Sequence, residues 1–337
     1  MPYFEVAIDE QKGSSYEIGY NQGENIPASL VEKFESIVNQ NIDVRAAENI
    51  FQQFAPHLLD EIKGLTDSLN IPYKKALSLF SGYDIPMLKG MGCSAVVTPN
   101  YYVRNYDFSP DSYDNRLAII NPQEAYASVG YSLHMVGRHE GVNEKGLALG
   151  FHFVNDTHSR KGLSAGSVLR IVLDTCQTTD EAIQLIKELP HAWSYNYSLG
   201  DASGQTAVVE ASPVEVKVRH DQQTLLCTNH FQHAEMGTYN RTAGNTLERL
   251  DHLDQAKTDH RTGKEMFDWF RDPNSPMFFD DYDNFFGTLH TFAYLFDEQK
   301  VLTAIANGRV LEIDMKNWNG EQRDLDEVMV GCLSHSS

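Results

Sequence analysis

The chain is short of cysteine, of positive charge and of long apolar runs. Its 337 residues hold four cysteines, none of them in a CxxC pair, which argues against a zinc knuckle or a disulfide framework. Free thiols are typical of a reducing compartment, so we expect a cytoplasmic protein. Lys and Arg number 27 and Asp and Glu 47, a net charge of −20 that repels nucleic acid and anionic membranes.

Further absences narrow the class. No stretch approaches the roughly 18 apolar residues of a transmembrane helix. The first ten residues, MPYFEVAIDE, lack the basic and apolar regions of a signal peptide. The histidines show no metal-ligand spacing such as HExxH, so we expect no metal, and we expect no cofactor. With 41% hydrophobic and 22% charged residues, the composition is that of an ordinary globular protein large enough to bury a sizeable core.

The sequence pattern changes near residue 92. Before it, apolar residues recur at helical spacing in 28–42, 46–65 and 72–83. After it, β-like runs dominate, with a helical block at 165–188 that restarts near 179, and further helices at 243–258 and 263–272. Strand runs broken by helical blocks predict two sheets with helices packed outside them, an α+β fold.

Residues 91–108, MGCSAVVTPNYYVRNYDF, place a thiol behind a glycine at the head of a β-like run. A thiol needs a base before it can act as a nucleophile. Either His and Asn elsewhere in the chain supply it, or cleavage before Cys93 frees an α-amino group of pKa about 7.7–8.0. Gly92 favours cleavage, because glycine tolerates strained backbone and lets the thiol approach the Gly92 carbonyl. An N-to-S acyl shift and hydrolysis would then release Cys93 as a new N-terminus.

The second run carries Arg104 and Asp107. Strand alternation puts Val103, Asn105 and Asp107 on one face and Arg104 on the other. The two charged residues therefore share a site only if the run bends or if Asp107 lies past the end of the strand. The spacing alone does not favour a catalytic role for Arg104 and Asp107 over an ion pair between them on an edge strand.

Six short motifs occur in the order typical of one family. The sequence resembles the N-terminal nucleophile (Ntn) hydrolases of the choloylglycine hydrolase and penicillin acyltransferase type over about residues 91–310. The motifs are GC at 92–93, RNYD at 104–107, GVNEKGLALG from 141, YNYSLGDASGQTAVVE from 195, CTNHF at 227–231 and NTLERLDHL from 245. The resemblance implies an αββα sandwich of two antiparallel sheets. Residues 1–92 would form a helical pro-segment, a separate subunit after self-cleavage, and 93–337 the catalytic domain.

The resemblance also implies roles for the charged residues. Cys93 matches the nucleophile and, through its freed amine, the base. Asp107 matches the acid that binds this amine, and Arg104 matches a basic group near the thiol, where a cation favours thiolate. Arg249 matches a late arginine of the family. Its structural alternative is an ion pair on a helix surface, and Arg241 is a rival for the same role.

Four polar residues compete to stabilise the oxyanion or contact the substrate. Asn196 is the best candidate for the oxyanion-hole amide. His152 stands at or beside a position where bile salt hydrolases have asparagine. It could donate only in one tautomer or when protonated; alternatively, a backbone amide is the donor and His152 packs in the core. Asn143 and Asn229, from the turn and T-N motifs, are further candidates.

The predicted activity is cleavage of a linear, non-peptide amide through an acyl-Cys93 thioester. Water resolves the thioester in a hydrolase, whereas an amine resolves it in an acyltransferase, for which acyl-CoA is a candidate donor; the sequence leaves both open. The expected partner is a small N-acyl amide, and a homo-oligomer stays open. A non-catalytic relative that binds an amide is the other class. A papain-like protease is disfavoured, because the usual sequence around its nucleophile is missing.

Overall fold

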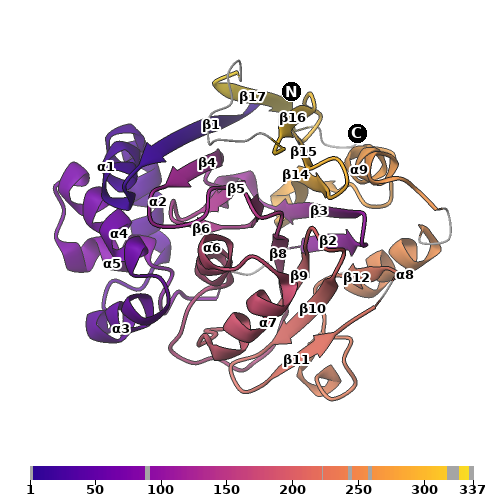
Figure 1. Cartoon of the computed structure of the whole chain (residues 1–337), viewed down its shortest axis with the longest axis horizontal. Helices are drawn as coiled ribbons and strands as arrows, with labels where there is room; N and C mark the ends of the chain where they lie inside the picture. Colours follow the sequence, from indigo (N-terminus) through magenta and orange to yellow (C-terminus); the bar gives the residue numbers. More distant parts are fainter. Residues whose placement is uncertain are drawn as a thin grey trace.

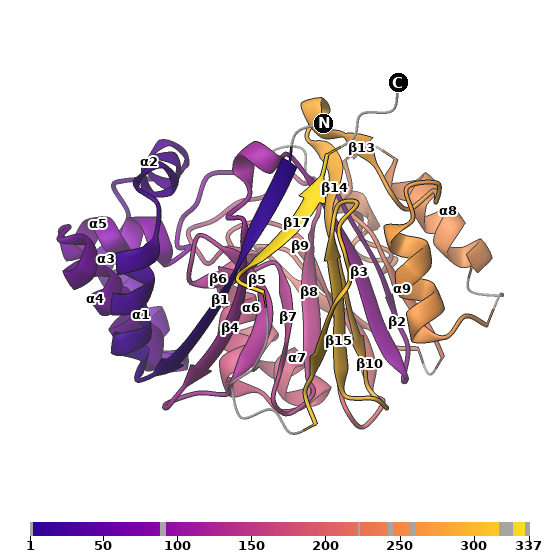
Figure 2. The ribbon, with the colours of Figure 1, turned by 90° about the horizontal axis from the view of Figure 1, so that it is seen from above.

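The computed structural model describes residues 3–87, 92–221, 223–241, 245–256, 260–316 and 326–333. Two sheets lie face to face between helices (Figure 1 and Figure 2). The larger sheet contains β1 (Tyr3–Gly13), β4 (Arg116–Pro122), β5 (Ser128–Leu133), β6 (Gly137–Arg138), β7 (Glu140–Asn143), β8 (Ala148–Phe153), β9 (Tyr195–Gly200), β10 (Thr206–Ala211), β11 (Val216–Arg219) and β17 (Val328–Cys332). The smaller sheet contains β2 (Gly92–Val97), β3 (Tyr101–Phe108), β12 (Leu225–Cys227), β13 (Asp280–Asp281), β14 (Phe286–Leu295), β15 (Lys300–Ile305) and β16 (Leu311–Asp314).

Strand order places the Cys93 motif in the middle of the smaller sheet. That sheet runs β12-β2-β3-β14-β15-β16, and the larger one runs β11-β10-β9-β8-β7-β5-β4-β1-β17. Among the described residues, neighbouring strands are antiparallel apart from the parallel pair β1–β4. β3 occupies residues 101–108, as the sequence predicts.

Helices cover both outer faces (Figure 2). Those packed on the larger sheet and at its end are α1 (Ser15–Asn25), α2 (Ala28–Ile37), α3 (Val44–Phe54), α4 (Pro56–Leu69), α5 (Tyr73–Phe80), α6 (Ala165–Thr175) and α7 (Thr179–Glu188); those on the smaller sheet are α8 (Thr246–Ala256) and α9 (Gly263–Arg271). One apolar cluster fills the space between the two sheets, and others lie under the helices. The predicted αββα sandwich is confirmed.

The prediction that the segment before residue 92 is helical is wrong for its first residues. β1 pairs in parallel with β4 and antiparallel with β17, inside the larger sheet. Phe4 and Val6 are buried while Glu5 between them is exposed, which is the period-2 pattern of a strand with one covered face. The pattern is short and mixed with acidic residues, so the sequence signal is weak.

A buried ion network joins the first 87 residues to the rest of the chain. Arg170 on α6 contacts Glu61 on α4 at 2.6 Å and Asp174 at 2.8 Å, and Asp174 also contacts His57 at 2.8 Å. Charges removed from water cost several kcal/mol each unless they are paired. The network therefore fixes α4 against α6 in one geometry.

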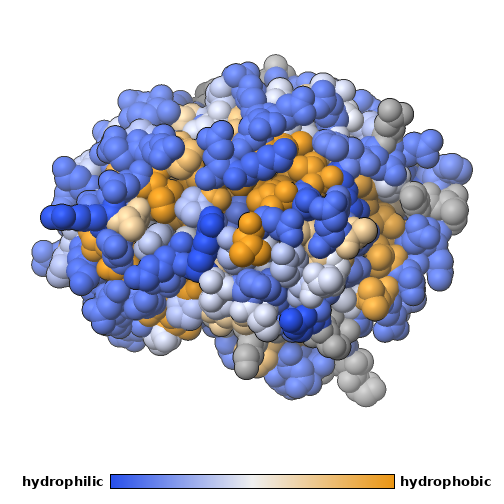
Figure 3. Space-filling model, turned by 90° about the horizontal axis from the view of Figure 1, so that it is seen from below, coloured by the Kyte–Doolittle hydropathy of each residue, from blue (hydrophilic) through white to orange (hydrophobic). Residues whose placement is uncertain are grey.

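The surface reflects the polar composition. The face seen in Figure 3 is mostly hydrophilic, with hydrophobic residues showing in its middle. Within the part of the chain that the structure describes, no helix is long and apolar enough to cross a membrane.

Candidate active site

Cys93 lies in the space between the two sheets. It is the second residue of β2, paired with Tyr106 of β3, and Gly92 is paired with Asp107. The thiol belongs to the apolar cluster between the sheets and is fully buried. Burial raises the pKa of the Cys93 thiol to about 11, although Arg104 and Arg249 pull in the opposite direction. In the uncleaved chain the thiol is therefore protonated at neutral pH.

Arg104 is the direct partner of the thiol. Its Nη2 donates to Cys93 Sγ at 3.0 Å and to the Phe151 carbonyl oxygen at 2.7 Å. Arg104 and Asp107 leave opposite faces of β3, as alternation predicts: Tyr106 joins the cluster between the sheets, while the amide of Asn105 reaches the Phe270 carbonyl of α9 at 2.8 Å. The edge-strand ion pair between Arg104 and Asp107 is therefore absent.

A buried carboxylate that the sequence analysis missed stands behind Arg104. Arg104 Nη1 donates to Glu140 Oε2, and both side chains are fully buried. His290 Nε2 lies 3.0 Å from the same oxygen, and its Nδ1 lies 2.6 Å from the Tyr113 hydroxyl. Burial would raise the pKa of Glu140, but His290 and Arg104 outweigh it and hold the pKa below its usual value. Glu140 is thus the counter-charge of the cation at the thiol.

Asp107 has an unused oxygen. Its Oδ1 accepts a hydrogen bond from Thr288 Oγ1 at 2.8 Å, whereas its buried Oδ2 has no hydrogen-bond partner in the described chain. The partner strand β14 has a register irregularity opposite this position, between Thr288 and His290. Burial raises the pKa of Asp107, and Arg249 and Thr288 offset this only in part. A buried carboxylate oxygen without a donor is costly, so the site is one donor short.

Asn229 and Arg249 hold the backbone of Cys93. The Cys93 amide donates to Asn229 Oδ1 at 2.8 Å, and Arg249 Nη1 donates to the Cys93 carbonyl at 2.6 Å. Arg249 Nη2 also donates to Asn229 Oδ1 at 2.8 Å. Because Arg249 is only 2% exposed, the surface ion pair considered for it is wrong. The rival Arg241 is exposed and donates to the carbonyls of Thr238 and Asn240.

Asn196, the predicted oxyanion donor, directs its amide toward the backbone. Its Nδ2 donates to the carbonyls of Thr228 at 3.0 Å and His230 at 2.8 Å, which flank Asn229. Both amide hydrogens are therefore used, and neither is left for an oxyanion. The geometry argues against Asn196 as the donor and assigns it instead the task of positioning the loop that carries Asn229.

His152 lies directly across from Asn196 on the neighbouring strand. Its Nε2 is 2.9 Å from Ser198 Oγ, and its Nδ1 has no hydrogen-bond partner among the described residues. Burial, followed by Arg104, holds the pKa of His152 well below its usual value, so the ring is neutral. The ring packs in the core against the Cys93 backbone, which pulls the pKa of His152 upward but does not offset burial.

Asn143 is not brought to this cluster. Its Nδ2 donates to the carbonyls of Leu173 and Cys176 at 2.8 Å, and its Oδ1 accepts from the amides of Lys145 and Leu147 at 3.1 Å. All its bonds go to backbone, so Asn143 ties the β7–β8 turn to the end of α6. It has no contact with Cys93.

Gly92 is required by close packing. A Cβ at this position would lie 2.3 Å from Cε2 of Phe286, far inside contact distance. The Phe286 ring in turn lies 5.3 Å from the Arg249 guanidinium. Gly92 is therefore held between an aromatic ring and β3, which carries Asp107.

The comparison with protein families gives a match. Residues 96–309 match the family model described as acyl-coenzyme A:6-aminopenicillanic acid acyl-transferase, and the chain belongs to this family. This family is named for an acyltransferase that uses acyl-coenzyme A. No curated protein matches the chain.

Three solved structures are similar to the chain at low identity. Penicillin V acylase from Agrobacterium tumefaciens is 19% identical, with 68% of this chain and 88% of that one covered and a TM-score of 0.49. A mutant of conjugated bile acid hydrolase from Clostridium perfringens is 13% identical, with 69% and 95% covered and a TM-score of 0.41. The Caenorhabditis elegans ortholog of N-acylethanolamine-hydrolyzing acid amidase is 11% identical, with 60% and 93% covered and a TM-score of 0.41.

Proposed function

We propose that the protein cleaves itself between Gly92 and Cys93 and then acts as an N-terminal cysteine amidase. One observation carries the proposal: Oδ2 of buried Asp107 has no hydrogen-bond partner in the described chain. Asp107 is also the cross-strand partner of Gly92, the residue before the cleavage point. A freed α-amino group at Cys93 would supply the missing donor. The ammonium form would also neutralise a carboxylate whose pKa burial raises.

Self-cleavage needs only the Cys93 thiol, the Gly92–Cys93 peptide bond and one water molecule. The Cys93 sulfur attacks the Gly92 carbonyl carbon, the peptide C–N bond breaks, and the nitrogen takes the proton to become the α-amino group. Water then hydrolyses the thioester to a Gly92 carboxylate and a free thiol. Gly92 has no side chain to obstruct the attack. Cys93 is held in place by Arg249, which donates to its carbonyl, and by Asn229, which accepts from its amide.

The same thiol then attacks substrate. The α-amine takes the thiol proton and later gives it to the leaving amine, since its ordinary pKa of about 7.7–8.0 suits both transfers. Arg104, 3.0 Å from the sulfur, favours the thiolate. Water resolves the acyl-Cys93 thioester.

Asn229 is the better candidate for the oxyanion donor. One of its amide hydrogens goes to the Phe153 carbonyl at 2.8 Å, and the other has no acceptor in the described ranges. It touches Cys93 directly, which Asn196 does not. A donor for the tetrahedral intermediate must lie beside the nucleophile.

An acyltransferase that passes the acyl group from acyl-CoA to an amine is the second candidate, favoured by the name of the family. We expect no cofactor in either reaction, and within the described ranges no three His, Cys, Asp or Glu side chains are grouped to hold a metal. A cytoplasmic location remains an expectation of the sequence, and a homo-oligomer stays open.

The test is to trap the acyl-enzyme. The protein is incubated with a panel of N-acyl amides and quenched, and the intact mass is measured. We expect an adduct of the acyl mass on Cys93, absent from Cys93→Ala and retained in Cys176→Ala, whose sulfur lies at the end of α6. Retained amide binding without an adduct or turnover would instead indicate the non-catalytic binding relative. With an amine added, a transferred acyl product would favour the acyltransferase.

A further inference from the structure

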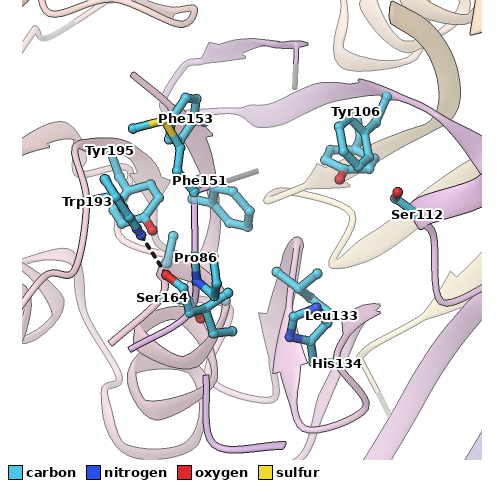
Figure 4. A pocket seen from close by; sticks show the side chains of 15 residues that line it. Pro86, Tyr106, Ser112, Leu133, His134, Phe151, Phe153, Ser164, Trp193 and Tyr195 are labelled. Carbon is cyan, nitrogen blue, oxygen red and sulfur yellow. Dashed lines mark hydrogen bonds between the residues drawn. The ribbon is translucent and has the colours of Figure 1, made fainter. Parts of the chain in front are cut away.

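A cavity of about 40 Å³ is lined mainly by aromatic and apolar side chains (Figure 4). Tyr106, the cross-strand partner of Cys93, lines it, and so does Phe151, whose carbonyl shares Arg104 Nη2 with the Cys93 sulfur. Phe153, Tyr195 and Trp193 extend the aromatic wall. Among the described residues, no charged side chain lines the cavity, so it suits the neutral acyl part of an amide.

The segment that precedes the proposed cleavage site closes this cavity. Ile85, Pro86 and Met87 form one wall, and Trp193 Nε1 donates to the Ile85 carbonyl at 2.8 Å (Figure 4). The present volume holds only one or a few waters. Cleavage after Gly92 would free one end of the segment that carries this wall, and its withdrawal would enlarge the space for an acyl group.

His134 differs from the other residues that line the cavity, because it has a buried ring nitrogen without a partner among the described residues. It is 5% exposed, lines the cavity, and its Nδ1 has no hydrogen-bond partner in the described chain. Burial lowers the pKa of His134, and Lys33 lowers it further against the pull of Asp114. The ring is therefore neutral, with one nitrogen that donates and one that accepts. A buried polar atom without a partner is costly unless a ligand or water completes it.

The turn that presents His134 is rigidly built. His134 and Met135 both have left-handed backbone, with φ of 52° and 64°, which is uncommon outside glycine. Asp114 Oδ2 accepts from the Met135 amide at 2.9 Å and from Ser132 Oγ at 3.0 Å, and Arg116 Nη1 donates to the Met135 carbonyl at 3.0 Å. Strained backbone held by buried charges is typical of functional positions.

We infer that His134 selects acyl groups that carry a hydroxyl group away from the scissile amide. This inference rests on the proposed amidase function. A hydroxyl both donates and accepts, as a neutral imidazole does, and it brings no charge into an uncharged wall. A carboxylate would be buried there without a counter-ion in the wall, and a plain hydrocarbon would leave the imidazole nitrogen unpaired.

The experiment compares matched acyl pairs on the cleaved protein. Coumarin amides of phenylacetic and 4-hydroxyphenylacetic acid form one pair, and those of hexanoic and 6-hydroxyhexanoic acid the other. We expect kcat/KM to favour the hydroxylated member by about tenfold in at least one pair, the value of one good hydrogen bond. In His134→Phe the ratio of kcat/KM within each pair should fall to about one, whatever the absolute rates. The control Leu133→Ala, in the same wall, should change both members alike.

A second measurement does not depend on the folding of a variant. The free acids 4-hydroxyphenylacetate and phenylacetate are compared as competitive inhibitors of the wild-type protein, and the hydroxylated acid should bind about tenfold more tightly. Equal rates and equal inhibition within each pair, or a preference that survives in His134→Phe, would overturn the inference but leave the amidase intact. Cleavage of none of the four amides and no acyl-Cys93 would overturn the amidase, and the inference with it.

Discussion

Arg104 and Glu140 form an ion pair that is fully shielded from water, and the same guanidinium donates to the Cys93 sulfur. The cation beside the Cys93 sulfur is thereby tied to a fixed anion on the opposite sheet. His290 and Tyr113 extend the chain of contacts behind that anion. The first prediction concerns this arrangement.

Glu140→Gln should act on the thiol through Arg104. Without the carboxylate, the charge of Arg104 is less neutralised, so the pKa of the Cys93 thiol should fall, since Glu140 is among the groups that raise it. The guanidinium also loses its anchor, and we expect kcat to fall by about 10–100-fold, the cost typical of losing a supporting contact. The pH profile of iodoacetamide alkylation gives the pKa. Glu140→Asp should recover part of the activity.

Glu140→Gln should also weaken the fold, because breaking a buried pair costs about 3–5 kcal/mol. Urea unfolding measures this loss separately from turnover. If Glu140→Gln has the alkylation profile and the kcat of the wild type, Glu140 does not act on the thiol and contributes only to stability.

Gly92→Ala should slow self-cleavage. The new methyl group would collide with the Phe286 ring, and overpacking of this kind costs about 1–3 kcal/mol, which corresponds to about 5–150-fold in rate. The double variant Gly92→Ala with Phe286→Leu removes the obstructing ring and should recover the rate. Gel analysis of cleavage over time compares the variants. Wild-type processing by Gly92→Ala alone would show that this packing does not matter.

Asp107→Asn should reduce turnover by about 10²–10⁴, as expected for a group that orients the catalytic base. The same substitution should increase the stability of the uncleaved chain. The raised pKa of Asp107 means that its ionised form costs stability in the intact chain at neutral pH. In a Cys93→Ala background, Asp107→Asn should therefore raise Tm at pH 7. The gain should vanish below about pH 4, where the unfolded carboxyl is also protonated. Unchanged turnover would contradict the catalytic role.

Asn229→Ala and Asn196→Ala separate the oxyanion donor from its support. Loss of a true donor costs about 10²–10³ in turnover, and we expect this of Asn229→Ala, with Cys93 still open to alkylation. Asn196→Ala should cost less, because it only loosens the carbonyls beside Asn229. His152→Asn should be mild. A larger loss in Asn196→Ala or His152→Asn than in Asn229→Ala would reverse the assignment.

Local patterns predicted most of the fold. The run 101–108 is a strand over those residues, and the helical block at 165–188 breaks into α6 and α7 as expected. The strand β1 was missed because its partners, β4 and β17, lie more than a hundred and more than three hundred residues away. Alternation is a weak signal when only two positions, Phe4 and Val6, are buried.

The candidate site could likewise be predicted from the sequence only in part. Cys93, Arg104 and Asp107 follow from one contiguous stretch, and alternation assigns their faces correctly. Glu140 could not be paired with Arg104 from sequence, because the two strands belong to different sheets. The one available signal was that Glu140 directly precedes the turn motif at 141–150. Asn196 was favoured by motif position, and only the direction of its amide hydrogens assigns it to support.

The central claim is that Cys93 becomes an N-terminal residue, and intact mass spectrometry of the purified, denatured protein tests it most directly. The account predicts two fragments, one ending at Gly92 and one starting at Cys93, that elute together before denaturation because β1 and the Glu61–Arg170 pair hold them. Cys93→Ala should give a single chain. A single uncleaved wild-type chain with full amidase activity would contradict the account.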